Sequence, residues 1–174
     1  MFKRKSNDSK SYYLLQRNSN CHSRIIWSGD ISSDNSLIIT GSRDKTLQVW
    51  GLNLNKEKEQ YTYLNKIILN EAITAVEFLP YNKSKEIKFA LVGLESGELI
   101  LYKFILDFNN SNVLSAKWEL IESLPNKISC GAKIKKISSV FNIKSNNILS
   151  AVCSDDYSVR IFSIILETLN NIDS

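Results

Sequence analysis

The sequence predicts an all-β protein built from about three repeated units of antiparallel strands. Two observations support this prediction. A gapless segment occurs three times, at 37–50, 89–102 and 149–162, and each copy ends on an aromatic residue. In each copy the residues one and three positions before the aromatic are apolar, which is the alternation of a strand with one buried face. No segment shows a sustained helical period, so a helical or mixed fold is excluded.

Each unit is expected to hold four strands, and the β-branched and aromatic content of the runs agrees with this. A first strand is predicted in each unit, at 24–32, 73–80 and 134–143. The repeated segment is predicted to form a hairpin, with strand pairs 35–41/46–51, 88–94/98–104 and 147–153/158–163. Further extended runs follow the first two hairpins, at 61–69 and 117–124, and the polar stretches 52–59 and 107–115 are expected to be surface loops.

The corner of the first hairpin carries the most informative residues. The stretch "GSRDKTLQVW" places Asp44 in a sharp polar turn six residues before Trp50. An indole N–H and a buried carboxylate both need partners in a dry site. His22, the only histidine, and a hydroxyl from Thr40 or Ser42 are suitable partners. In the third unit Asp156 occupies the place of Asp44, but Phe162 can donate no hydrogen bond.

Composition excludes several classes of protein. The chain has 174 residues, a net charge of +4 and three cysteines without a close pair. This fits neither a disulfide framework nor a zinc site, so we expect a reducing compartment, the cytoplasm or the nucleus. No apolar stretch is long enough for a membrane helix. Residues 1–10 read as a basic tail and 11–174 as one domain, with units near 20–69, 70–124 and 125–174.

These residues resemble those of the WD-repeat β-propeller family, over 22–163. In that family a histidine before the first strand and a hydroxyl on the second strand link the corner aspartate to the tryptophan. The resemblance therefore implies a structural network of His22, Thr40 or Ser42, Asp44 and Trp50, with Asp156 as its remnant in the third unit. The departure is "CH" at 21–22 where the family has Gly-His.

More narrowly, "HSRIIW" with "SRDKTLQVW", and "ITAVEF" with "VGLESGELILY", resemble the C-terminal propeller of the Elongator subunit 2 family. This resemblance implies a scaffold that is not an enzyme and has no cofactor or metal. The implied partners are protein subunits, namely the large scaffold subunit and the catalytic subunit of a complex that modifies wobble uridine in transfer RNA. Indirect contact with transfer RNA is also implied.

Other readings of the same residues are weaker or remain open. His22, Ser42 and Asp44 form a nominal Ser-His-Asp set, but the blade pattern already accounts for the single histidine. A different WD-repeat adaptor, in ubiquitin ligation, trafficking or chromatin, has the same core. RNA binding rests only on the mild basicity, including "KIKK" at 133–136.

Partner recognition is predicted at Arg24 and Arg43, with Lys45 as a weaker third candidate. Both arginines lie in loops that open on one rim of a WD blade, and arginine suits planar carboxylate or phosphate groups. Three blades do not close a ring of four to eight. The chain is therefore expected either to be part of a longer protein or to receive blades from another chain, with 11–18 as the outer strand of a preceding blade.

Overall fold

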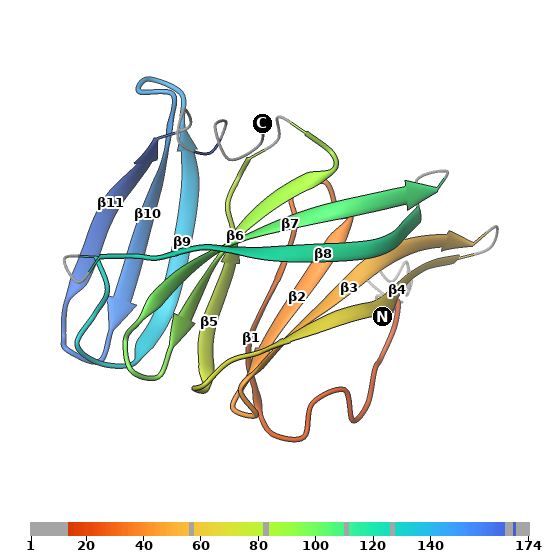
Figure 1. The fold of residues 1–174 in the computed structure, drawn as a ribbon, viewed down its shortest axis with the longest axis horizontal. Coiled ribbons are helices and arrows are strands. Elements are labelled where there is room, and N and C mark those ends of the chain that lie inside the picture. Colours follow the sequence, from red (N-terminus) through yellow and green to blue (C-terminus); the bar gives the residue numbers. More distant parts are fainter. Residues whose placement is uncertain are drawn as a thin grey trace, which may run out of the picture.

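The computed structural model describes residues 14–55, 58–81, 84–109, 112–125, 128–165 and 169. Within these ranges the secondary structure elements are eleven β-strands in three antiparallel sheets, which we call blades 1, 2 and 3. Figure 1 shows the blades side by side in an open fan. The all-β fold predicted from the sequence is confirmed.

The strands of each blade follow one another in chain order. Blade 1 holds β1 (Ile26–Ile31), β2 (Leu37–Ser42), β3 (Thr46–Asn55) and β4 (Lys58–Ile68). Blade 2 holds β5 (Ile73–Phe78), β6 (Ile87–Leu94), β7 (Leu99–Asn109) and β8 (Asn112–Ser123). Blade 3 holds β9 (Ile134–Asn142), β10 (Asn147–Ser154) and β11 (Val159–Ile165). The three predicted hairpins are confirmed as β2/β3, β6/β7 and β10/β11.

Two details differ from the expectation. Blade 3 has three strands, not four, among the described residues. The predicted loops at 52–59 and 107–115 are wrong, because the strand ladders continue to Asn55↔Lys58 and Asn109↔Asn112. Polar side chains suit a solvated strand as well as a loop, so composition did not separate the two. The two long hairpins meet where Leu54 N donates to Asn112 Oδ1 at 2.6 Å.

Blade 2 is buried on both faces. Alternate residues along β6 enter two different clusters: Ala90 and Val92 pack toward blade 1, whereas Phe89 and Leu91 pack toward blade 3. Burial on both sides explains why "FALVGL" and "LILYKFIL" are almost continuously apolar. Blades 1 and 3 each keep one face that no described strand covers.

The first strands of neighbouring blades are tied by carboxylates. Asp30 Oδ2 on β1 accepts a hydrogen bond from Phe78 N on β5 at 2.7 Å. Glu77 Oε1 on β5 accepts one from Ser139 N on β9 at 3.0 Å. Burial raises the pKa of Glu77, and the negative charge of Asp30 acts in the same direction. The same contact, repeated one blade further on, sets the spacing of the innermost strands.

An ion pair between a buried lysine and a more exposed aspartate joins blades 1 and 2 at the other end of the strands. Lys88 Nζ on β6 lies 2.9 Å from Asp34 Oδ2 in the β1–β2 turn, and the lysine side chain is 4% exposed. Burial opposes the charged form of Asp34, but hydrogen bonds from Lys88, Ser36 and Ser32 outweigh it and lower the pKa to about 2.

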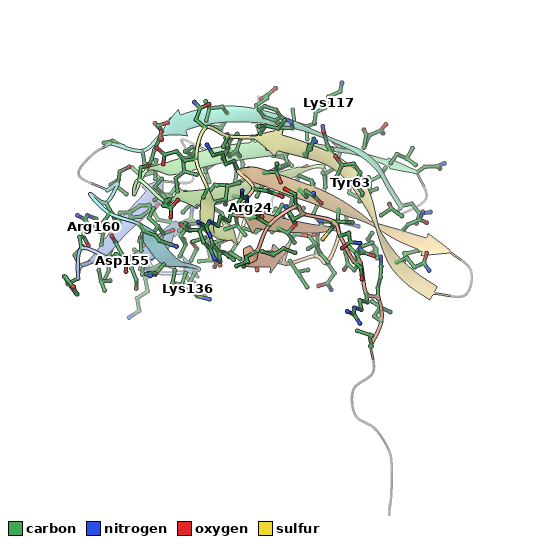
Figure 2. All side chains as sticks on the ribbon, turned by 90° about the horizontal axis from the view of Figure 1, so that it is seen from below. Arg24, Tyr63, Lys117, Lys136, Asp155 and Arg160 are labelled. Atoms are coloured by element: carbon green, nitrogen blue, oxygen red, sulfur yellow. The ribbon has the colours of Figure 1, made fainter. Side chains whose placement is uncertain are left out.

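The hairpin turns of the three blades share one rim, which we call the lower rim, at the bottom of Figure 1. Each turn has one residue with positive φ at the same aligned place: Lys45 at 69°, Gly97 at 93° and Tyr157 at 62°. This is a three-residue hairpin loop closed by a left-handed residue. Figure 2 looks at the molecule from below and shows Arg24 near the middle, with Asp155 and Arg160 toward blade 3.

Candidate functional site

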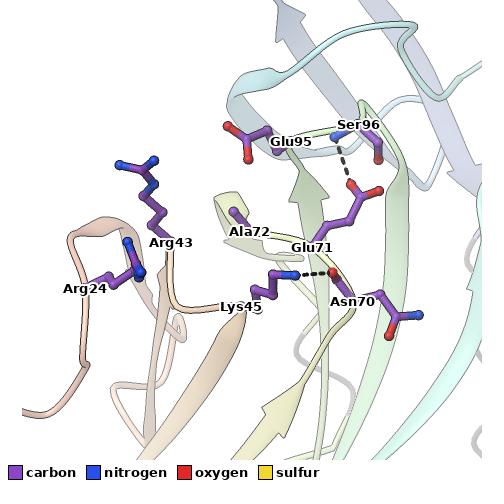
Figure 3. A pocket seen from close by; sticks show the side chains of 8 residues that line it. All are labelled: Arg24, Arg43, Lys45, Asn70, Glu71, Ala72, Glu95 and Ser96. Atoms are coloured by element: carbon purple, nitrogen blue, oxygen red, sulfur yellow. Dashed lines mark hydrogen bonds between the residues drawn. The ribbon is translucent and has the colours of Figure 1, made fainter.

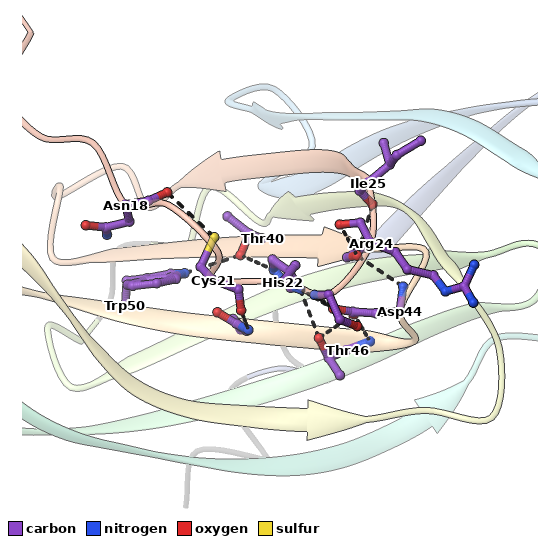
Figure 4. Close-up of polar contacts among 12 residues, drawn as sticks. Asn18, Cys21, His22, Arg24, Ile25, Thr40, Asp44, Thr46 and Trp50 are labelled. Carbon is purple, nitrogen blue, oxygen red and sulfur yellow. Dashed lines mark hydrogen bonds and ion pairs between the residues drawn. The ribbon is translucent and has the colours of Figure 1, made fainter.

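A polar network lies at the lower rim of blade 1 (Figure 4). His22 reaches it from the segment before β1, Thr40 from β2, Asp44 from the β2–β3 turn and Trp50 from β3. His22 Nδ1 lies 3.0 Å from Asp44 Oδ2, and His22 Nε2 lies 2.9 Å from Thr40 Oγ1. Trp50 Nε1 donates to the same Thr40 oxygen at 3.2 Å.

One protonation state of His22 is consistent with the series of hydrogen bonds that runs from Asp44 through His22 and Thr40 to Trp50. A neutral imidazole with its proton on Nδ1 donates to Asp44 and accepts the Thr40 hydroxyl proton at Nε2, while Thr40 Oγ1 accepts the indole N–H. The His22 side chain is 0% exposed and that of Asp44 is 8% exposed. The network is therefore largely shielded from solvent, and it links two strands to the chain segment that enters the blade.

Asp44 also organises its own turn. Its Oδ1 accepts hydrogen bonds from Thr46 Oγ1 at 2.6 Å and Thr46 N at 3.0 Å, and its Oδ2 accepts one from Ser23 N at 2.9 Å. Burial favours the neutral form of the carboxyl group, but hydrogen bonds from Thr46, Ser23 and His22 outweigh it and lower the pKa of Asp44 to about 2. Thr46 is a member of the network that the sequence analysis missed.

Ser42, the alternative hydroxyl, has a different place. Its Oγ donates to Ile25 O at 2.9 Å and accepts from Asp44 N at 3.1 Å. It does not bond His22, so Thr40 is the hydroxyl that joins the histidine to the tryptophan. The nominal Ser-His-Asp set is therefore not assembled, because Ser42 contacts the backbone of the aspartate and not the imidazole.

Blades 2 and 3 have neither the hydroxyl nor the indole of this network. The positions aligned with Thr40 are Val92 and Val152, both fully buried. The aligned aromatics, Tyr102 and Phe162, carry no indole N–H. In blade 2 the β6–β7 turn is bonded to the segment before β5, since Ser96 N donates to Glu71 Oε2 at 3.0 Å.

In blade 3 an arginine takes the place of the histidine. Arg160 Nη1 lies 2.8 Å from Asp156 Oδ2 and 3.1 Å from Cys130 Sγ, and it also bonds Ser158 Oγ. Hydrogen bonds from Ser158 and Arg160 hold the pKa of Asp156 well below its usual range. The Asp156–Arg160 spacing of four residues was visible in the sequence, and it places both side chains on one face in a strand as well as in a helix.

A cleft of about 530 Å³ opens between the lower rims of blades 1 and 2 (Figure 3). Arg24 and Arg43 project from one side of it and Glu71 and Glu95 from the other. The arginine loops are joined by Arg43 N, which donates to Ile25 O at 3.0 Å. Both arginine residues are exposed. Lys45 lines the same cleft, but its Nζ donates to Asn70 O at 2.9 Å and so closes the gap between the two blades.

The basic run at 133–136 is largely engaged within the molecule. Lys133 Nζ lies 3.7 Å from the centre of the Trp27 ring, and Lys135 Nζ lies 3.0 Å from Asp155 Oδ2. The first contact joins blade 3 to β1 of blade 1 across blade 2. Among the described residues, no helix is long and apolar enough to cross a membrane.

The comparisons with known proteins agree with this geometry. The family described as WD domain, G-beta repeat matches residues 14–51, which include all the residues of the blade 1 network. Elongator complex protein 2 of Dictyostelium discoideum is 29% identical over 91% of this chain and 18% of its own length. The protein of that name from Saccharomyces cerevisiae is 29% identical over 92% of this chain and 19% of its own.

The Mus musculus protein with the same name is 37% identical over 48% of this chain and 10% of its own length. The chain thus spans about a fifth or less of the curated relatives that it matches. The three blades, the network of blade 1 and these relatives lead to one conclusion. Residues 14–51 match the WD-repeat family, the three sheets are consistent with blades of an incomplete WD-repeat propeller, and the chain is similar over most of its length to Elongator complex protein 2.

Proposed function

We propose that the chain is a scaffold without catalytic activity and that it supports the assembly of Elongator subunits. The relatives carry the name of a subunit of that complex, and this observation carries the proposal. By the resemblance, the partners are the large scaffold subunit and the catalytic subunit, and the complex modifies wobble uridine in transfer RNA. The chain then acts in the cytoplasm or the nucleus.

The network of blade 1 has a structural role in this proposal. His22, Thr40, Asp44 and Trp50 satisfy one another, so no group in the network is free to attack a substrate or bind a metal. Their contacts hold the loops of Arg24 and Arg43 in place instead. Ser42 supports the turn from its backbone side, and Asp156 repeats the arrangement in blade 3 with Arg160.

The partner-binding surface is proposed at the cleft between blades 1 and 2. Arg24 and Arg43 are exposed, stand on adjoining loops and have no hydrogen bond or ion pair from their guanidinium groups among the described residues. Two such groups suit carboxylates of a partner protein, and Glu95 on the opposite wall restricts the partner's charge pattern. Lys45 contributes through the shape of the cleft, since its ammonium group is already bonded.

The experiment is a charge reversal of both arginines, Arg24→Glu with Arg43→Glu, in the full chain. Folding is checked by circular dichroism, and capture of the other Elongator subunits is then measured with the tagged chain as bait. The matched control is Lys117→Glu with Lys144→Glu, two exposed lysines away from the rim. We expect loss of capture for the arginine variant only. Full capture by a folded arginine variant would end the proposal for this surface.

Experiments on the same tagged chain distinguish two other functions from this proposal. If tagged wild-type chain captures no Elongator subunit, a different WD-repeat adaptor is the better reading. Direct RNA binding would show as a steep decrease of affinity with salt. The structure favours it less, because Lys133 and Lys135 are engaged by Trp27 and Asp155.

A further inference from the structure

The outer edge of the middle blade is open along β8. This strand comes last in the order β5-β6-β7-β8, and no described strand pairs with its other side. All four residues from 117 to 120 are exposed, and Figure 2 shows Lys117 at the outer margin of the molecule. Blades 1 and 3 already cover the two faces of blade 2, so this edge stays open whatever else stacks on those two blades. The edge of a sheet presents unpaired N–H and C=O groups that can accept another strand.

Blade 1 shows how such an edge is closed within the chain. On its edge strand β4, Tyr61 N donates to Gln16 Oε1 at 2.8 Å, and Tyr61 O accepts a hydrogen bond from Gln16 Nε2 at 2.9 Å. The side-chain amide of Gln16 thus takes the place of a peptide group in a neighbouring strand. Among the described residues, no hydrogen bond of this kind reaches the outer backbone groups of residues 116–120. The edge of β8 is therefore free to pair.

The regular part of β8 limits how it can pair with a copy of itself. Residues 115–120 pair with β7 without a shift, and a register shift lies on either side of them. In an antiparallel pair, opposed residues that bond each other turn their N–H and C=O groups toward the partner strand, and these groups alternate in direction along a strand. Two opposed residues must therefore be an even number of positions apart, so that the pairing is centred on one residue that lies opposite its own copy.

Trp118 is the centre that gives complementary pairs. With this centre, Lys117 lies opposite Glu119 of the second copy, and Ala116 lies opposite Leu120. A two-fold interface repeats each contact, so the pair of opposite charges occurs twice. If the centre is Lys117 or Glu119 instead, two like charges lie directly opposite each other, which destabilises a strand pair. A lone lysine would protect the edge, but the glutamate two positions further on gives it a partner.

The side chains on the Trp118 face are suited to an interface. Trp118 is 39% exposed, and its ring packs edge-on against Tyr102 with the ring centres 5.9 Å apart. Leu120 is 55% exposed on the same strand. Aromatic pairs across antiparallel strands stabilise a sheet, and tryptophan is enriched among the residues that dominate binding energy. Pairing about Trp118 thus brings two indole rings together and shields the two leucines.

We propose that β8 pairs with β8 of a second copy of this chain, antiparallel and centred on Trp118, so that two copies form a symmetric dimer. One continuous sheet then crosses both middle blades. This interface is separate from the proposed partner cleft, because no residue of β8 lines that cleft. A substitution of Lys117 therefore remains a valid control for capture of other subunits.

The test exchanges the two charges in the full chain and measures self-association by sedimentation velocity over a range of concentrations, under reducing conditions. Lys117→Glu and Glu119→Lys each create two like-charged pairs across the centre, and we expect each to weaken self-association by at least about tenfold. An equimolar mixture of the two variants has opposite charges in both pairs, so it should associate about as tightly as the wild type. Lys144→Glu, at an exposed lysine in the β9–β10 turn, is the matched control and should associate as the wild type does.

A cysteine at the centre gives a second measurement that does not depend on charge. Directly opposed Cα atoms of antiparallel strands lie about 4.5–5.5 Å apart, which is within the reach of a disulfide. In a background of Cys21→Ser with Cys153→Ser, we expect Trp118→Cys to form a disulfide-linked dimer on oxidation and Lys117→Cys to stay monomeric.

The crosslink also carries the test if Glu119→Lys does not fold, since Lys103 lies opposite Glu119 within the blade. A wild-type chain that sediments independently of concentration would overturn the proposal and leave the edge to a strand of another protein. Folded single variants that associate as the wild type does would also overturn it. The same holds for a mixture that associates as weakly as its components, and for equal crosslinking at both positions.

Discussion

Replacing Thr40 by valine tests the network of blade 1 at its central atom. Thr40 Oγ1 contacts both the Trp50 indole N–H and His22 Nε2, at 3.2 and 2.9 Å. Valine has almost the same shape, so packing changes little and the loss is confined to hydrogen bonds. It also stands at the aligned positions of the other two blades, so the strand accepts it.

The expected cost follows from burial. Trp50 is 9% exposed and the His22 side chain 0%, so both groups are largely shielded from water. Each buried polar group left without a partner costs about 1–3 kcal/mol, and two such groups predict a loss of about 2–6 kcal/mol. Since small domains have about 5–15 kcal/mol of stability in total, this is a large fraction.

The assay is urea denaturation followed by tryptophan fluorescence, with Thr62→Val as the matched control. Thr62 is exposed and its hydroxyl makes one long contact, 3.4 Å to Gly51 O. We expect a change below about 0.5 kcal/mol for the control. Adding Trp50→Phe to Thr40→Val removes the orphaned N–H, so the two substitutions should be non-additive by about 1–2 kcal/mol. Equal stability of the two valine variants, or strict additivity in the double variant, would refute the reasoning.

Three further predictions concern other charged contacts. Lys88→Met removes the buried ammonium group that donates to Asp34 and to the carbonyl oxygens of Ser84 and Lys85, and should lower the free energy of unfolding by about 1–3 kcal/mol in urea titrations; an unchanged free energy would contradict a stabilising role for these contacts. Because the folded-state pKa of Asp44 lies below its unfolded value of 3.8, its stabilisation is present above about pH 4 and lost as pH falls toward 2. Comparing wild type with Asp44→Asn across this range should show a difference of about 2 kcal/mol that vanishes at the acid end, and a constant difference would contradict the assignment. Arg160→Ala should speed hydrogen exchange at the Ser158 amide, which donates to Asp156, whereas unchanged exchange would mean that the turn holds without the guanidinium.

The repeat was readable in the sequence because it depends on local rules. Strand alternation, the polar turn and the final aromatic recur at one spacing, and all are set by residues within a single hairpin. The same rules identified His22, Asp44 and Trp50, since each residue type has a hydrogen-bonding need that the others meet. The choice between Thr40 and Ser42 stayed open, because the two residues lie on one face of β2 and the choice depends on which position along the strand lies beside the indole and the imidazole. Thr46 and Arg160 were missed for a similar reason: both work through contacts across a turn.

The sequence by itself thus determined the fold class, the number of units and the kind of network in the first unit. Those properties follow from side-chain period and turn chemistry, which act over a few residues. Only the tertiary structure decided which residues form the contacts between blades. It placed Asp30 beside the backbone N–H of Phe78, and Lys88 beside Asp34. Such contacts join residues about 50 positions apart. Their energies depend on burial that exists only after the sheets have stacked.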